Sequence, residues 1–219
     1  MAEKWKISEP VVEHPSKASC GLTQAVQCAI AQGDDLRGRH FEGESLAFAD
    51  GPVLDVAGCV FERCTFGELA LKRISFADCV FDKCEWSNVR LNHAAFQRVR
   101  FQNCRMTGME LPGGVLMNTH FNGCAMDYLS MSQTKLDRTV FEECRMRESL
   151  WSEVHLPKAR FENCDLTRAQ WTRTPLMGTD MSTCRIDGWS ITLYDLRGVK
   201  LTAAQVISLS GLLGVEIVS

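Results

Sequence analysis

The chain has 219 residues, a formal charge of −3 and a pI near 6.0. This balance argues against a protein that holds nucleic acid by bulk positive charge. The first residues are charged where a signal peptide needs an apolar run, and no segment has enough consecutive apolar residues to cross a membrane. We therefore expect a cytoplasmic protein with no membrane partner.

Residues 1–33 are predicted to form an N-terminal arm and a cap. Residues 1–21 contain two prolines and no sustained period, so we expect an extended arm with one short strand around Val11. Thr23 is suited to cap a short helix over about 23–31, which Gly33 would end. The helix would cover the open end of the repeat array that follows, because an uncovered end pairs with other chains.

Residues 34–201 form the predicted repeat domain. An apolar residue occurs at every fifth position from Leu36 to Leu201, and of these 34 slots only Gly51 is not apolar. A period of five fits neither a strand nor a helix, so the segment is interpreted as an array of repeats. The residue two positions before each slot is mostly small or apolar. Two of every five residues therefore point inward and three point outward.

A longer period of 20 residues sets the predicted shape. Phenylalanine recurs every 20 residues from Phe41 to Phe161, and a cysteine follows three positions after each from Phe61 onward. Four five-residue units then make one turn, which predicts an all-β, right-handed quadrilateral parallel β-helix of about eight turns and roughly 40 Å. The predicted core-stacking residues are Phe61, Phe81, Phe101, Phe121, Phe141, Phe161, Cys64, Cys84, Cys104, Cys124, Cys144 and Cys164.

Nine of the eleven cysteines lie two residues before an apolar slot. This placement is typical of a small apolar filler in a reducing compartment. A metal needs converging ligands, whereas these cysteines would form a column along the axis with no histidine in register. We expect no metal site.

Two stretches inside the repeat are irregular: residues 49–52 (ADGP) and residues 111–114 (LPGG). Both keep the count of five, so neither is an insertion. A locally widened corner is the favoured interpretation, and a kinked surface that a partner recognises is the alternative.

The surface charge is uneven along the chain. Residues 34–89 carry 11 acidic and 6 basic residues, a balance of −5, whereas residues 90–135 carry 2 acidic and 5 basic, a balance of +3. The pattern fits a solvated surface of mixed sign. It also fits an acidic end that binds a basic groove, and both interpretations stay open.

Residues 202–219 are predicted to form a C-terminal helix and strand. Thr202 and Gln205 have the spacing of a capping box, the helix should run to about Leu213, and Gly214 can end it. A short strand is expected at 215–218. The apolar residues exceed what one narrow coil needs for cover, so we expect a symmetric dimer through this end. The predicted interface is Val206, Leu209, Leu212, Leu213, Val215 and Ile217.

No pattern for catalysis is found. The five histidines are scattered, phosphate-loop and hydrolase motifs are absent, and a narrow packed rod has no room for a concave pocket. We predict no enzyme, no catalytic residue and no bound cofactor.

The repeat unit resembles the pentapeptide-repeat family, as in residues 64–68 (CTFGE), 84–88 (CEWSN) and 164–168 (CDLTR). Residues 198–217 are similar to the C-terminal helix and strand of its topoisomerase-protecting branch, which includes Qnr, MfpA and the albicidin- and microcin-immunity proteins. The register from Val56 to Leu201 has no insertion. It is therefore more similar to the loopless Qnr-like proteins of Gram-positive bacteria, or to MfpA, than to plasmid-borne Qnr.

The resemblance implies a homodimer that mimics duplex DNA and binds DNA gyrase and topoisomerase IV, without binding nucleic acid directly. Two rods joined tip to tip would span about 80 Å, on the scale of 25 base pairs. Such a protein would protect against fluoroquinolones or natural topoisomerase poisons, as an antibiotic-resistance or immunity factor. The alternative is a pentapeptide-repeat scaffold that binds an unrelated protein. An enzyme with a site in the arm is a third hypothesis, and no residue supports it.

Overall fold

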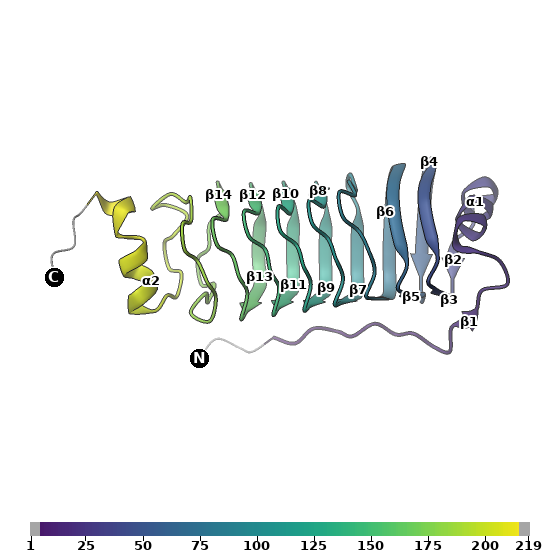
Figure 1. Ribbon diagram of the computed structural model, residues 1–219, viewed down its shortest axis with the longest axis horizontal. Helices are drawn as coiled ribbons and strands as arrows, with labels where there is room; N and C mark the ends of the chain where they lie inside the picture. The colour runs from purple at the N-terminus through teal and green to yellow at the C-terminus, as the bar shows by residue number, and fades with distance from the viewer. Residues whose placement is uncertain (1–4, 215–219) are drawn as a thin grey trace.

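The computed structural model describes residues 5–214, apart from the side chain of Leu213. The chain forms a rod of stacked coils with a helix at each end (Figure 1). Strands on neighbouring coils pair in parallel with a shift of 20 residues, so that Phe61 lies opposite Phe81 and Phe101 opposite Phe121. The predicted parallel β-solenoid of four five-residue units per turn is confirmed. Between Leu36 and Leu201 it has about eight turns at this shift.

All strand pairs are parallel, and the strands belong to two sheets. The larger sheet contains β1 (Ser16–Lys17), β2 (Leu36–Arg37), β3 (Arg39–Glu42), β4 (Ser45–Ala57), β5 (Val60–Glu62), β6 (Thr65–Asp82), β7 (Ala95–Gln102), β9 (Val115–Asn122), β11 (Lys135–Glu142) and β13 (His155–Glu162). The smaller sheet contains β8 (Glu110–Pro112), β10 (Ser130–Ser132), β12 (Leu150–Ser152) and β14 (Gln170–Thr172).

The corners of the coil lie two residues after an apolar slot. Residues there adopt a left-handed backbone, with φ of 53° at Arg63, 52° at Asn103 and 62° at Gly123. Most residue types avoid this conformation, and glycine and asparagine tolerate it best. A left-handed residue redirects the chain at many of these corners, whereas the long strands β4 and β6 pass corners such as Phe48 and Glu68 without one.

The phenylalanine column fills the centre of the rod. Ring centroids from Phe61 to Phe161 are separated by 4.8 to 5.0 Å, and the rings are within 10° of parallel. All six rings are at most 2% exposed. Stacked aromatic pairs at this distance add stability beyond their area burial. The spacing is also the rise per coil, so eight coils span roughly 40 Å.

The cysteine column fills space and also donates hydrogen bonds. The Cys124 thiol donates to the carbonyl oxygens of Phe101 (3.6 Å) and Asn122 (3.5 Å). Thr134 occupies the same position in another unit and donates to Leu111 O at 2.6 Å. Burial raises the pKa of the Cys59 and Cys79 thiols. The cysteines and threonines at this position therefore fill space and also satisfy carbonyl oxygens, a role that the apolar-filler interpretation did not include.

The first helix, α1 (Leu22–Gln32), packs on the first coil through Leu22, Val26 and Ala29. Gly33 ends it with φ of 71°, as predicted. The prediction that Thr23 caps the helix was wrong: Gly21 is the N-cap residue, and Thr23 lies in the first turn and donates to Ser45 O at 2.9 Å. The carboxylate of Glu44, from the neighbouring coil, accepts the Leu22 amide instead.

The prediction of a strand around Val11 was also wrong. The short strand lies at Ser16–Lys17 and pairs with β3, whereas Val11 has no strand partner and is 59% exposed. The arm crosses the edges of the coils lengthwise (Figure 1), so its backbone cannot pair with strands that run across the rod.

Both irregular stretches keep the register. Gly51 pairs with Leu71, and Leu111 pairs with Met131. Their backbones therefore remain part of the regular array.

At the other end, α2 (Ala203–Ser208) begins with the predicted capping box between Thr202 and Gln205. The prediction of one helix to Leu213 was wrong, because the α-helix ends at Ser208 and a 3₁₀-helix, η1 (Ser210–Leu213), follows. Leu209 joins the two and is only 8% exposed, so its inward packing tightens the turn. Gly214 ends η1 with φ of 64°, as predicted, and the strand expected at 215–218 lies outside the described residues.

Helices long and apolar enough to cross a membrane are absent from the described part of the chain.

Candidate protein-interaction surface

One column of outward residues follows the phenylalanine stack along the rod. Each member directly precedes a stacked ring or its equivalent and so points to the outside of the same side of the coil. We call this column the arm face: His40, Val60, Val80, Arg100, His120, Val140 and Arg160.

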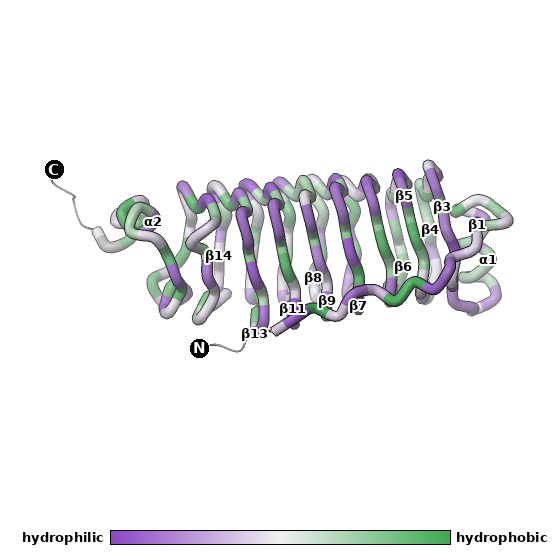
Figure 2. The backbone as a smooth tube through the Cα atoms, turned by 90° about the horizontal axis from the view of Figure 1, so that it is seen from below, coloured by the Kyte–Doolittle hydropathy of each residue, from purple (hydrophilic) through white to green (hydrophobic). Residues whose placement is uncertain are grey.

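The N-terminal arm, residues 5–15, runs lengthwise over the arm face (Figures 1 and 2). The Arg160 guanidinium lies over the ring of Trp5, with its Cζ 4.8 Å from the centroid. Three coils nearer α1, Arg100 pairs with Glu9 at 3.4 Å. A cation over an indole is attracted by the negative face of the ring. The arm is thus attached to the rod by side chains at two separated coils.

The backbone of the arm is also bound by side chains of the rod. The amide of Ser8 donates to Asn118 Oδ1 at 3.2 Å, and the amide of Val11 donates to Asp78 Oδ1 at 3.0 Å. These bonds replace the sheet ladder that a lengthwise segment cannot form.

Asp78 is held in place by Arg98 on the next coil. Two hydrogen bonds of 2.6 Å join the guanidinium to both carboxylate oxygens. These bonds, together with the Val11 amide, hold the pKa of the Asp78 carboxyl below its ordinary value, although partial burial opposes the shift. A bidentate pair of this kind fixes the orientation of the carboxylate and stabilises its ionised form.

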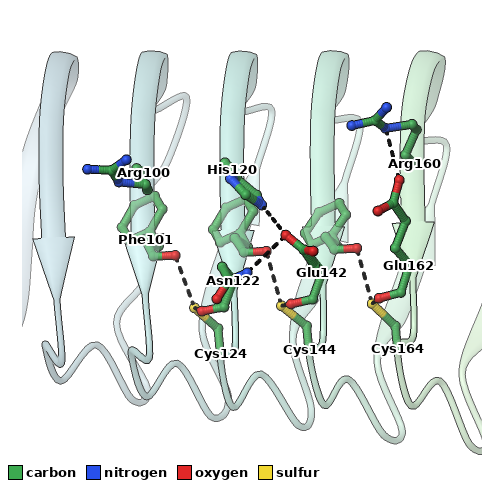
Figure 3. Close-up of polar contacts among 12 residues, drawn as sticks. Arg100, Phe101, His120, Asn122, Cys124, Glu142, Cys144, Arg160, Glu162 and Cys164 are labelled. Atoms are coloured by element: carbon green, nitrogen blue, oxygen red, sulfur yellow. Dashed lines mark hydrogen bonds and ion pairs between the residues drawn. The ribbon is translucent and has the colours of Figure 1, made fainter. Parts of the chain in front are cut away.

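Glu142 links neighbouring coils beside the arm, and Arg160 contacts Glu162 within its own strand, β13 (Figure 3). Glu142 Oε2 lies 3.0 Å from His120 Nε2 and accepts a hydrogen bond from Asn122 Nδ2 at 2.9 Å. Arg160 Nε lies 3.3 Å from Glu162 Oε1. These contacts fix the side chains on which the arm rests.

Surface hollows lie on both sides of Trp5. One, of about 480 Å³, is lined by residues of the arm together with His120, Val140 and Glu162. The other, of about 490 Å³, extends toward the C-terminal end past Asp180 to Lys200. Both hollows are lined by Trp5, Arg160 and Glu162, so the described part of the arm leaves room beside it on this side of the rod.

Elsewhere the surface carries ion pairs between coils. Arg145 pairs with Asp127 and Arg147 with Asp165, both at 2.7 Å. In the acidic half, Arg73 pairs with Asp55 at 2.9 Å. Several carboxylates are thus neutralised locally, which favours a surface of mixed sign over a uniformly acidic one.

The residues predicted for a dimer interface differ in their exposure to solvent. Val206 is 52% exposed, as an interface residue must be, and Leu212 is half-buried. Leu209 is 8% exposed and packs with the hydrophobic core, so it offers little surface to a partner. The Leu213 side chain, Val215 and Ile217 lie outside the described residues.

Ile207 was missed as an interface candidate and is 58% exposed. It adjoins Val206 on a short helix, so both expose apolar surface at the tip of the rod. The sequence already pointed to Ile207, because it is one of the apolar residues of the C-terminal segment that exceed what covering the last coil requires.

The arm contacts were missed entirely. Trp5 is a bulky aromatic residue between two lysines, and that is the one signal available from the sequence. Within residues 5–214, no three histidine, cysteine or acidic side chains converge in a way that could hold a metal.

Comparison with known proteins gives one family match. A family model described as a pentapeptide repeat region matches residues 55–122 and 94–171, which together span just over half of the chain. No curated protein sequence matches.

Two solved structures match the chain at low sequence identity, and the first has a similar fold. HetL, a pentapeptide repeat protein from the cyanobacterium Nostoc sp. strain PCC 7120 that is involved in heterocyst differentiation regulation, is 14% identical with a TM-score of 0.52. The match covers 80% of this chain and 92% of HetL. Full-length QnrB1, a plasmid-mediated fluoroquinolone resistance protein, is 18% identical with a TM-score of 0.38, over 84% of this chain and 91% of QnrB1.

Proposed function

The chain belongs to the pentapeptide-repeat family, and on that premise we propose that it binds DNA gyrase and topoisomerase IV as a homodimeric mimic of duplex DNA. In this role it protects the enzymes from fluoroquinolones or natural topoisomerase poisons. It acts as a shaped surface, and catalysis has no part in the proposal.

The observation that carries the proposal is a straight, uninterrupted rod that ends in exposed apolar residues. The Phe stack repeats at 4.8 to 5.0 Å without a break from Phe61 to Phe161. At the tip, Val206 and Ile207 are more than half exposed. Joining two tips would bury these side chains and double the rod to roughly 80 Å, the length scale of a bound DNA segment.

A second candidate function is a scaffold that binds an unrelated protein. The ion pairs favour it, because Asp55, Asp127 and Asp165 lie beside arginines and do not present a continuous row of free negative charge. A duplex mimic needs such a row to compete for a DNA-binding groove.

A supercoiling assay separates the two functions. Purified protein is titrated into gyrase in the presence of ciprofloxacin and, separately, of an albicidin-type poison. Recovery of supercoiling supports the proposal, and failure to recover with either poison at any concentration contradicts it. A pull-down from the host cytosol that recovers another protein and no gyrase subunit would support the scaffold.

A pair of variants tests whether protection requires the dimer. V206E/I207E should lose protection if the tip-to-tip rod is required. M177E changes a side chain that is 74% exposed on the repeat domain and should behave as the wild type.

A further inference from the structure

We propose that the arm face is a docking site for an extended peptide segment, and that the chain's own N-terminal arm occupies this site when no partner is bound. The partner is a protein segment with an aromatic residue followed four positions later by a carboxylate. The inference is independent of the topoisomerase proposal.

The first argument is the way in which the arm is held. A strand added to a sheet edge is bound through backbone pairs and tolerates many sequences. Here the segment crosses the coils, and each attachment is made by a side chain of the rod: Arg160, Asn118, Arg100 and Asp78. Side-chain contacts of this kind select for particular residues, so the surface recognises a sequence.

The second argument is a match of two spacings. Asp78 and Arg160 lie on coils that are four 20-residue steps apart, which is roughly 19 Å at about 4.8 Å per coil. Their partners, Val11 and Trp5, are six residues apart, and six residues of extended chain span roughly 20 Å. A straight peptide therefore stays in register with the coils over its whole length.

The third argument is the weak hold on the arm. None of the residues from Trp5 to Pro15 is buried, and the Glu9 side chain is 61% exposed. Exposed ion pairs contribute little, and segments with few buried contacts open at low free-energy cost. The rod surface beneath is held by contacts within the rod, because Arg98 fixes the Asp78 carboxylate through two hydrogen bonds. A partner can thus displace the arm without disturbing the rod.

The contacts define the motif. The aromatic residue lies against Arg160, and the carboxylate four positions later pairs with Arg100. Positions three and six after the aromatic residue must have a free amide for Asn118 and Asp78, so proline is excluded there. Proline is accepted at position five, where the arm has Pro10.

The experiment uses the full chain and a fluorescent peptide of the sequence WKISEPVVEH. Binding is measured by fluorescence polarisation for the wild type and for W5A. W5A loses the contact between ring and guanidinium in its own arm, so it should bind the peptide about tenfold more tightly. Equal affinity for the two proteins would overturn the proposal.

A second variant tests the location of the peptide. Adding Arg160→Ala to W5A should weaken peptide binding about tenfold, since the peptide's tryptophan then lacks its partner. Adding Arg173→Ala should change nothing, because Arg173 pairs with Glu153 on another side of the rod. If Arg173→Ala weakens binding, or if Arg160→Ala leaves binding unchanged, the peptide binds at another site and the proposal fails.

Hydrogen exchange gives a readout independent of affinity. In the wild type the amides of Ser8 and Val11 should be partly protected by their bonds to Asn118 and Asp78, and should exchange faster when unlabelled peptide is added. Peptide binding that leaves both amides protected would contradict displacement of the arm.

Discussion

Gly51 lies directly beneath Ile30 of the capping helix. A Cβ built on Gly51 would come within 2.5 Å of Ile30 Cγ2. Gly51 is also the one slot of the five-residue register that is not apolar. The missing side chain is therefore replaced by a residue from another element, and the helix packs into the gap that the glycine leaves.

This relationship predicts the effect of filling the gap. Gly51→Ala should lower the free energy of unfolding by about 1–3 kcal/mol, because the added methyl group overpacks the contact. Ile30→Ala should offset part of this loss when the two changes are combined. Urea denaturation of the single and double variants measures the coupling. Gly211→Ala, at a position where a Cβ meets no atom within 4 Å, serves as the control, and an equal loss there would refute the packing argument.

The phenylalanine stack should dominate stability. Phe101→Ala removes a ring that is 1% exposed and should cost on the order of 3–5 kcal/mol in chemical denaturation. Phe48 is 52% exposed, so Phe48→Ala should have the small effect of a surface change. Similar losses for the two variants would contradict the assigned register.

The cysteines should differ sharply in reactivity. Nine thiols are buried in the rod, whereas Cys28 is exposed and Cys20 is half-buried. A thiol reagent should therefore label only Cys28 and Cys20 in the folded protein, and all eleven after denaturation. Cys28→Ser should reduce native labelling to one site. Rapid labelling of further thiols in the native protein would show that the cysteine column is accessible.

Acid should release the arm from Asp78. The pKa of this carboxyl is held low by the Arg98 hydrogen bonds, so the contribution of the ionised group to stability is present above its unfolded pKa. That contribution is lost as the pH falls through the lower, folded pKa. The chemical shift of the Val11 amide should accordingly change below about pH 4. Asp78→Asn should remove the transition, and its persistence in that variant would assign it to another group.

The tip of the rod should control association. V206E/I207E should yield monomers in analytical ultracentrifugation, because two charges would be placed on the exposed apolar surface. Leu209→Ala should lower stability without changing the oligomeric state, since Leu209 packs on the last coil. A V206E/I207E protein that remains dimeric would exclude this surface as the interface.

The extent to which the sequence predicts the structure differs between the rod and its ends. Phe101 and Cys124 recur at a fixed interval, so their neighbours on adjacent coils follow from counting. The cap of α1 was misassigned to Thr23 because Glu44, which binds the Leu22 amide, comes from another element. The inward packing of Leu209 also depends on residues far from it in the chain.

By itself the sequence determined the coil, its period, its four faces and the family to which the chain belongs. Each coil packs against neighbouring coils that have the same 20-residue pattern, so the position of a residue in the repeat also specifies its contacts on those coils. Only the tertiary structure decided the path of the arm, the pairing of Trp5 with Arg160 and the contact between Gly51 and Ile30. These contacts join unlike segments that are far apart in the chain, and no period in the sequence records where such segments meet.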